Sequence, residues 1–273
     1  MKKIAMMLLM VSLLLTGCGT QDEPHQEKME AYLVERLEMY ENDKLTTIKE
    51  YSYNENGVRI GETIQDENGN DLKKAEYHLN ENGKINQIVY LNNSGDILET
   101  LTYDEEANFI KREVDNEIWE YIYNDQNLMT EDKLYVDNNL IGRTIYSYDK
   151  DGKLIRDEYY AIDGTSLAGV DDNYVYDDMG NVSSYHLTGY DNDGKIYQEG
   201  DVKYTYSYEN DLLSSLVIDY GDLQTSYEYK YDQFHNIIEM HYSDSVISYY
   251  TKKTYKTIEV SDQKQKEYCE KWN

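Results

Sequence analysis

Turn-forming clusters recur roughly every twelve to fourteen residues over most of the stretch from Leu45 to Val260, and they limit the folds open to this chain. Each cluster is an Asp or Asn, two further residues and a Gly. Gly and Asn accept the positive φ that tight hairpin turns require, so each cluster predicts a reversal of an antiparallel ribbon. The clusters are Asn54–Gly57, Asp66–Gly69, Asn80–Gly83, Asn92–Gly95, Asp149–Gly152, Asp177–Gly180 and Asp191–Gly194, with degenerate versions at Asp104–Ala107, Asn124–Asn127 and Asp232–His235.

Between the turns, apolar and polar side chains alternate, as they do on strands with one buried face. The chain has 31 Tyr but only two Phe and two Trp, and no proline follows Pro24. Tyrosine suits a pleated, half-buried surface, and aromatic pairs across neighbouring strands contribute about 0.2–1 kcal/mol each. We therefore predict an all-β fold of roughly sixteen to eighteen strands. This repetitive antiparallel hairpin meander should curl or coil, because a flat sheet of that size would be unusual.

The segment before the repeats, residues 28–43, carries a different pattern. Its apolar side chains recur at spacings of four, four and three, at Met29, Leu33, Leu37 and Tyr40. This spacing predicts an amphipathic N-terminal helix. We expect the helix to cap the first edge of the sheet, with partner binding as the alternative. The repeat domain then covers 44–260, and a polar tail covers 261–273.

The first residues predict an export signal over 1–17. Lys2 and Lys3 precede an apolar stretch that is too short to span a bilayer, and Leu15-Thr-Gly17-Cys18 closes it. This tetrapeptide resembles the lipobox of bacterial lipoproteins. The resemblance implies cleavage between Gly17 and Cys18, a diacylglyceryl group on the Cys18 thiol, and often a further acyl chain such as palmitate on the new amino terminus.

The lipobox resemblance also implies a location. Two or three acyl chains on Cys18 would anchor the protein to the membrane on the extracytoplasmic side of the cell envelope, with residues 18–27 as lipidated cysteine and linker. An ordinary cleaved secretory signal with an accidental cysteine is the alternative. Cys269 is the second cysteine of the chain, so lipidation of Cys18 would leave no pair for an intramolecular disulfide.

The charge of the chain is strongly acidic. Removal of Lys2 and Lys3 with the signal leaves 24 basic against 54 acidic residues, a net charge of −30. Such a surface repels phosphates, which argues against a nucleic-acid partner. It attracts cations or a basic partner protein, and it keeps a tethered protein away from anionic lipid.

One repeat unit recurs most clearly as Tyr146-Ser-Tyr148-Asp149-Lys-Asp-Gly152-Lys-Leu154, and residues 174–182 copy it nearly as well. Partial copies occupy residues 51–57, 190–196 and 229–237. These units resemble the RHS or YD-repeat family, whose unit is Tyr-x-Tyr-Asp-x-x-Gly. The resemblance implies hairpin repeats wound into a β-shell at a cell surface. Only about a dozen residues follow the last predicted strand, so we do not expect the carboxy-terminal toxin that some members of the family enclose.

Signals for chemistry are sparse. His235 and His241 lie six residues apart across a turn, but no cysteine and no unambiguous third ligand accompanies them. Asp191–Gly194 invites a calcium interpretation, but the twelve-residue loop pattern fails, and type I′ turn chemistry explains the residues. No Gly-x-Ser-x-Gly, His-Glu-x-x-His or phosphate-binding glycine loop occurs. We predict no enzyme, no metal site and no cofactor. A carbohydrate-active enzyme using unidentified carboxylates is the weakest alternative.

Two rows of tyrosines form the candidate binding face, namely Tyr204, Tyr206, Tyr208, Tyr227, Tyr229 and Tyr231. Aromatic rings stack on sugars and anchor protein contacts, although such rows also stabilise a sheet without binding anything. The sequence thus predicts a membrane-anchored, non-catalytic cell-surface scaffold that binds a glycan or protein ligand, in an oligomeric state left open. The alternative is an immunity or antitoxin-like protein that masks a basic toxin at the envelope.

Overall fold

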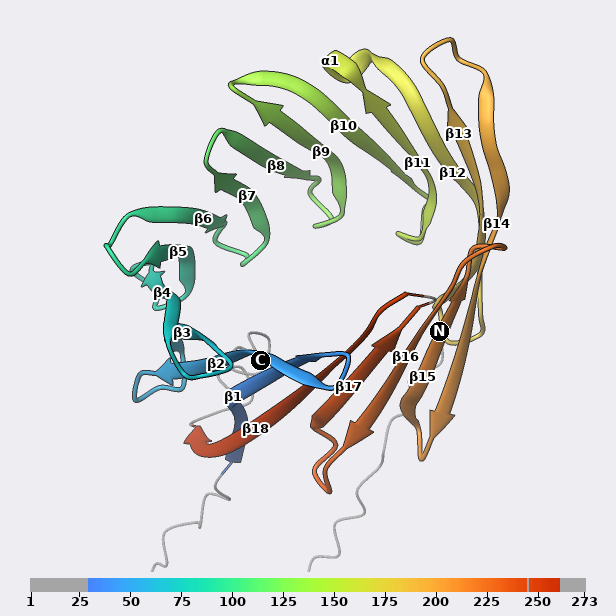
Figure 1. Ribbon diagram of the computed structural model, residues 1–273. Coiled ribbons are helices and arrows are strands. Elements are labelled where there is room, and N and C mark those ends of the chain that lie inside the picture. The colour runs from blue at the N-terminus through green and yellow to red at the C-terminus, as the bar shows by residue number, and fades with distance from the viewer. Residues whose placement is uncertain (1–28, 245, 261–273) are drawn as a thin grey trace, which may run out of the picture.

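The computed structural model describes residues 29–244 and 246–260, and they form one closed β-barrel (Figure 1). Each strand pairs antiparallel with the next along the chain, and β18 pairs with β1. The strands are β1 Met29–Glu41, β2 Lys44–Tyr53, β3 Arg59–Asp66, β4 Asp71–Leu79, β5 Ile85–Asn92, β6 Ile97–Tyr103, β7 Phe109–Val114, β8 Glu117–Tyr123, β9 Met129–Val136, β10 Asn139–Tyr148, β11 Leu154–Ala161, β12 Ser166–Tyr176, β13 Val182–Tyr190, β14 Ile196–Glu209, β15 Leu212–Asp219, β16 Gln224–Tyr231, β17 Ile237–Ser243 and β18 Ser248–Val260. One helical turn, α1 Ile162–Thr165, lies between β11 and β12.

The predicted antiparallel meander and strand number are confirmed, but the predicted curled or coiled YD-type sheet is wrong, because the sheet closes on itself. Its first strand lies between β2 and β18, with Arg36 opposite Glu50 and Met29 opposite Val260. Closure pairs the edges that an open sheet would expose. The repeats specify hairpins between neighbouring strands, but they carry no signal for pairing between the first and last strands.

The predicted helix over 28–43 is also wrong, because Met29–Glu41 is strand β1 and belongs to the barrel. The helical stripe of Leu33 and Leu37 was a coincidence of spacing. Ala31, Leu33 and Val34 are almost completely buried, and the register of β1 shifts by one residue between Val34 and Arg36. A bulge of this kind breaks the strict alternation by which a strand is recognised.

The Asp/Asn-x-x-Gly clusters form the predicted hairpin reversals, but not as type I′ turns. In the cluster at Asp149, Gly152 alone has positive φ, at +79°, and its N–H donates to the Asp149 carbonyl at 3.1 Å. The Asp149 carboxylate accepts the N–H groups of Asp151 and Lys153 at 2.8 and 2.9 Å, which lowers its pKa. One left-handed residue followed by a register shift is the pattern of a type I turn with a G1 bulge.

Type I′ turns occur at three other hairpins. Both central residues have positive φ at Asn42-Asp43, Asp137-Asn138 and Asn210-Asp211, as a type I′ turn requires. None of these pairs contains Gly, so the sequence search for Gly-terminated clusters did not identify them.

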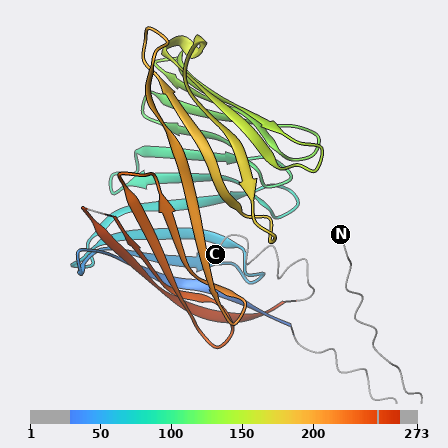
Figure 2. The same ribbon diagram turned by 90° about the vertical axis from the view of Figure 1, so that its right-hand side faces the viewer.

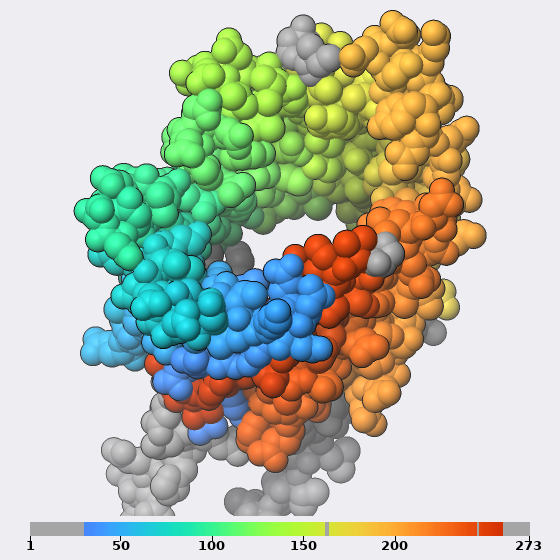
Figure 3. Space-filling view, viewed as in Figure 1, coloured from blue at the N-terminus to red at the C-terminus, as the bar shows by residue number. Residues whose placement is uncertain are grey.

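The two faces of the sheet differ in chemistry. On β4, Ala75 and Tyr77 are buried, whereas Lys74, Glu76 and His78 between and beside them are exposed. The same alternation runs along β14 and β16, where tyrosines alternate with exposed polar side chains. Because side chains converge on the concave side of a closed sheet, the tyrosine-rich face is the inner one. An eighteen-stranded barrel is too wide for its side chains to fill, and Figure 3 shows the hollow interior.

The buried core is therefore a layer on the inner wall. Its main cluster of buried residues is Val58, Ala75, Tyr77, Ile85 and Ile88. Nearby, Glu62 is buried and ion-paired to Lys49 at 3.1 Å, and it accepts the Tyr77 hydroxyl at 3.1 Å. Burial is the main cause of the raised pKa of Tyr77.

The barrel has two distinct ends. Met29 lies opposite Val260, so both ends of the described chain leave the barrel at the same end, which we call the terminal rim (Figure 2). The turns after even-numbered strands lie there. The opposite end, the far rim, carries the turns after odd-numbered strands and α1. Within 29–244 and 246–260, no helix is long and apolar enough to cross a bilayer.

Candidate functional site

The six tyrosines predicted as a binding face point into the barrel, because each occupies an inner-wall position of β14 or β16. Tyr204 lies opposite Ile218, and Tyr227 lies opposite Leu216 and Tyr242. Tyr208 is the most exposed of the six, at 38%. The sequence identified the right strands and their shared face, but it did not indicate that this face lines a lumen.

Two of the six tyrosines have a structural role. The Tyr206 hydroxyl donates to the Val182 carbonyl at 3.0 Å, and the Tyr231 hydroxyl donates to the Leu213 carbonyl at 2.8 Å. Five further tyrosines make the same bond from an even-numbered strand to the preceding strand, namely Tyr53, Tyr123, Tyr148, Tyr176 and Tyr255. We call these seven residues the carbonyl-bonded tyrosines.

Other inner-wall tyrosines stack in the ladders that the sequence predicts. Tyr174 and Tyr185 stack with ring centroids 5.1 Å apart, and Tyr204 continues the row at 6.2 Å from Tyr185. A second row joins Tyr227, Tyr242 and Tyr249 across β16, β17 and β18. The rings give the lumen an aromatic lining that reaches across several strands.

Carboxylates interrupt this aromatic lining on β9, β11 and β12. Asp132 accepts the Tyr146 hydroxyl at 2.6 Å, and Asp157 accepts the Tyr174 hydroxyl at 2.6 Å. Asp171 lies directly opposite Asp157 across the sheet. Burial, and to a lesser extent the charges of Asp157 and Asp172, raises the pKa of Asp171 to about 6. Among the described residues, Asp171 has no hydrogen-bonding or ion-pairing partner for its side chain.

A cavity of about 220 Å³ lies beside this carboxylate pair, on the far-rim side of strands β11 to β14. Gly169 lies opposite both Tyr159 and Gly189, so two neighbouring inner-wall positions carry no side chain. We call this cavity the glycine pocket, and its main lining residues are Asp157, Tyr159, Gly169, Asp171, Gly189 and Tyr197. Its lining contains no Lys, Arg or His.

The tyrosine rings of the glycine pocket lie against glycines. A Cβ on Gly189 would lie 2.9 Å from the Tyr197 ring, and one on Gly142 would lie 3.5 Å from the Tyr159 hydroxyl. Tyr197 is 67% exposed and Tyr159 is 48% exposed. Each ring therefore contacts a glycine-bearing strand and still leaves much of its surface open to the lumen or the far rim.

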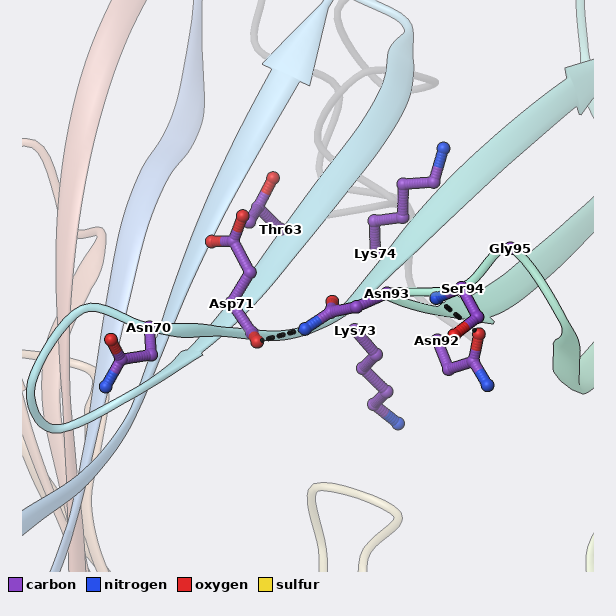
Figure 4. A pocket seen from close by; sticks show the side chains of 9 residues that line it. All are labelled: Thr63, Asn70, Asp71, Lys73, Lys74, Asn92, Asn93, Ser94 and Gly95. Carbon is purple, nitrogen blue, oxygen red and sulfur yellow. Dashed lines mark hydrogen bonds between the residues drawn. The ribbon is translucent and has the colours of Figure 1, made fainter.

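A second, wider hollow lies between the turns that join β3 to β4 and β5 to β6 (Figure 4). It measures about 660 Å³ and is polar and open to solvent. The Asn93 side chain donates to the Asp71 carbonyl at 2.7 Å, and so holds the two turns together. Lys73 and Lys74 point to opposite sides of β4, as neighbours on a strand must (Figure 4). The polar groups that line this hollow hold the turns in place, so fewer of them are available to bind a ligand than in the glycine pocket.

The outer wall carries ion pairs. Arg156 contacts Glu158 at 2.8 Å and Asp172 at 3.1 Å. Lys230 contacts Glu239 at 2.6 Å. A barrel that spans a membrane presents an apolar band about 25 Å tall to lipid. Charged side chains at outer positions in the middle of strands, such as Glu158 on β11 and Asp172 on β12, do not form such a band.

The histidines weighed for a metal site serve other contacts. His235 occupies the positive-φ position of its turn, and His241 stacks on Tyr250 at 5.1 Å and contacts Glu239 at 3.2 Å. Asp191 of the calcium candidate accepts the N–H groups of Asp193 and Lys195 at 2.9 Å. The described part of the chain contains no group of three or more His, Cys, Asp or Glu side chains placed to hold a metal ion. Gly17 and Cys18 of the predicted lipidation site lie outside the described residues, as does the tail over 261–273.

Sequence reasoning missed Asp132, Asp157, Asp171 and the paired glycines. With 54 acidic residues, nothing distinguishes three carboxylates that face inward from those that face outward. The sequence does carry one signal for the pocket, because Gly169 and Gly189 stand inside predicted strands and not in turn clusters. Such a Gly inside a strand marks a close approach or a space.

Comparisons with known proteins show distant similarities of shape. No family model and no curated protein matches the chain. A porin-like protein from Bacteroides uniformis is 11% identical, with 82% of this chain and 96% of that chain covered and a TM-score of 0.44. A porin-like protein from Bacteroides vulgatus is 10% identical, with 82% and 98% covered and a TM-score of 0.33. The Tc holotoxin pore of Photorhabdus luminescens is 12% identical, with 81% of this chain but 15% of that chain covered and a TM-score of 0.26. Likenesses this weak do not bear on function.

Proposed function

We propose that this protein is a non-catalytic receptacle of the cell envelope, tethered by lipid on Cys18, whose tyrosine-lined lumen binds a ligand. The observation that carries the proposal is the division of side chains between the two walls. Over β9 to β14, aromatic rings and the carboxylates of Asp132, Asp157 and Asp171 line the inside, whereas Arg156, Glu158 and Asp172 form ion pairs on the outside. Aromatic surface that a closed barrel keeps open to its lumen, instead of covering it, is typical of ligand sites.

The tether and the barrel ends support an orientation. Met29 follows Cys18 by eleven positions, a reach of at most about 40 Å at 3.3–3.6 Å per residue. A lipid on Cys18 would hold the terminal rim within that distance of the membrane. The far rim, with the glycine pocket beside it, would then face away from the membrane, toward ligands arriving from outside.

The YD-type units support the same proposal. The second tyrosine of Tyr-x-Tyr-Asp is a carbonyl-bonded tyrosine in the units at Tyr148, Tyr176 and Tyr231. Membership of the RHS or YD-repeat family remains our proposal, and it would make this chain a short member that closes into a barrel.

A variant that adds bulk to the inner wall beside the glycine pocket tests the proposed function. A Cβ on Gly200 meets nothing within 4 Å, and Gly200 lies opposite Leu187 on the inner wall. Gly200→Trp therefore adds a large ring to the inner wall at a position where the Cβ is unobstructed, and Thr205→Trp places the same ring on the outer face of β14. We expect ligands retained from glycan arrays and envelope extract to bind wild type and Thr205→Trp but not Gly200→Trp. Retention by Gly200→Trp and loss in Thr205→Trp would refute the proposal.

A second candidate, the immunity-like role, is favoured by acidic turns at both rims, for example Asp104-Glu-Glu at the terminal rim and Asp191-Asn-Asp193 at the far rim. It predicts capture of one basic protein by the outer surface, equal in both tryptophan variants and weakened by salt. The tether is tested separately. Cys18→Ser in the full-length gene should move the protein from the membrane fraction to the soluble fraction, and retention in the membrane would contradict lipid anchoring.

A further inference from the structure

The glycine pocket combines three features that no structural role requires together. It is a cavity on the inner wall, two exposed tyrosine rings border it, and two carboxylates lie at its edge. Asp157 and Asp171 lie directly opposite each other, an arrangement that destabilises a sheet when both are charged. A sheet that tolerates this repulsion beside a cavity is a candidate for a ligand that relieves it.

The pocket supplies no positive charge of its own. The nearest candidate is Arg156, but it lies on the outer wall, where Glu158 and Asp172 hold it at 2.8 and 3.1 Å. Asp157 already accepts a bond from the Tyr174 hydroxyl, which brings no charge. The ligand that completes this site is therefore one that brings a positive charge.

The rings decide between an organic cation and a metal ion. Tyr159 and Tyr197 offer ring surface, and the face of an aromatic ring attracts an ammonium group within about 6 Å. A hard metal ion needs six or more oxygen ligands, and no metal-holding group occurs within the described ranges. The same rings would also stack on a sugar, but a neutral sugar leaves the facing carboxylates uncompensated.

We propose that the glycine pocket binds an organic ammonium group, held between Asp157 and Asp171 and covered by the rings of Tyr159 and Tyr197. This inference rests on the proposed lumenal function and names its ligand class. The glycines at 169 and 189 provide the space, and the position near the far rim gives access from the side away from the proposed tether.

The test uses the mature lipoprotein in detergent, with tetramethylammonium and 1,5-diaminopentane as probes and glucose as the neutral control. We expect saturable calorimetric binding of at least one ammonium probe at pH 8, weakened about tenfold or more by Asp171→Asn, because the variant removes one of the two negative charges that attract the probe. Asp172→Asn is the matched control, one residue away on the outer wall, and should bind as wild type does. Gly169→Leu fills the pocket at a position where a Cβ makes only ordinary contacts, and it should abolish binding while the circular dichroism spectrum is retained.

Three results would overturn the inference. Absence of saturable binding by either ammonium probe contradicts it, and so does saturable binding of glucose in their place. Equal loss in Asp171→Asn and Asp172→Asn would mean that the probes respond to overall acidity. In each case a ligand retained by wild type and lost in Gly200→Trp would still support the lumenal receptacle, so the two proposals fail separately.

Discussion

Asp171→Asn should stabilise the barrel at neutral pH. Asp171 faces Asp157 across the sheet, and the protein holds the pKa of Asp171 at about 6 instead of 3.8. A shift of about two units corresponds to about 3 kcal/mol at full burial. Because Asp171 is only half-buried, solvent screening reduces this, and we expect a gain of about 1 kcal/mol. For a domain of this size that is a rise in Tm of about 2–4 °C.

The pH dependence fixes the cause of that gain. A carboxyl group whose pKa is raised in the folded state binds more protons folded than unfolded, so its penalty is absent below the ordinary pKa of 3.8, grows as pH rises, and is complete above about pH 6. Thermal melts of Asp171→Asn and wild type should therefore differ most at pH 8 and converge only below about pH 3.8. Asp172→Asn, which loses the ion pair to Arg156, should be unchanged or less stable at pH 8. A gain of equal size at both pH values, or no gain at pH 8, would refute the repulsion argument.

Three further predictions follow from single contacts. Tyr148→Phe should lower the free energy of unfolding by about 0.5–1.5 kcal/mol in denaturant melts, because it removes the 2.6 Å hydrogen bond to the Met129 carbonyl. The outer-wall control Tyr135→Phe should leave stability unchanged, and an equal loss in both variants would contradict the prediction. Ala107→Gly should stabilise by about 1 kcal/mol, since Ala107 holds φ at +65°, and a loss of stability would show that the turn does not strain alanine. The pKa of His186, measured by NMR, should lie above 6.5, because hydrogen bonds to Asp201 and Glu199 raise it. The contribution of His186 to stability should be complete below pH 6.5 and be lost as pH rises through the raised pKa. Asp201→Asn should lower the midpoint, and an unchanged midpoint would contradict the assignment.

The sequence predicted those parts of the fold that are encoded locally. Each Asp/Asn-x-x-Gly cluster carries its own turn chemistry, so the hairpins and the strand number were predictable. Closure was not, because Met29 pairs with Val260 across the whole length of the domain and neither residue signals the other. The first strand was misassigned because Leu33 and Leu37 are spaced as on a helical stripe, and the bulge at residues 34–36 breaks the alternation that marks a strand.

The candidate site was predictable in residue type but not in position. Alternation placed Tyr204 and Tyr206 on one face, and that face proved to be the inner wall. The same alternation placed Asp171 on that face and Asp172 on the other, but nothing in the sequence states which of the two faces a lumen. The glycines opposite each other at 169 and 189 come from different strands, so their pairing required the register.

The two tyrosines of the Tyr-x-Tyr-Asp unit now have separate roles. The second tyrosine donates to a carbonyl of the preceding strand, and each of the seven acceptors lies at a register shift, as at Leu154, which accepts from Tyr176. A bulge disrupts the backbone ladder locally, and the hydroxyl supplies the bond that links one hairpin to the next. This explains why tyrosine, and not phenylalanine, fills the inner wall of a barrel too wide to form a dry core.

The first tyrosine of the unit lies two residues earlier in the strand, on the same inner wall, and does not donate to a backbone carbonyl of the preceding strand. Tyr146 and Tyr174 donate to Asp132 and Asp157, and Tyr204 and Tyr229 occupy the corresponding place on β14 and β16. Substitution of the second tyrosines should therefore reduce stability before it affects binding, and substitution of the first should affect binding at little cost in stability. The comparison of Tyr231→Phe with Tyr229→Phe in melts and in ligand retention separates the two. If both variants lost stability equally and retained the same ligands, the division of roles would be wrong.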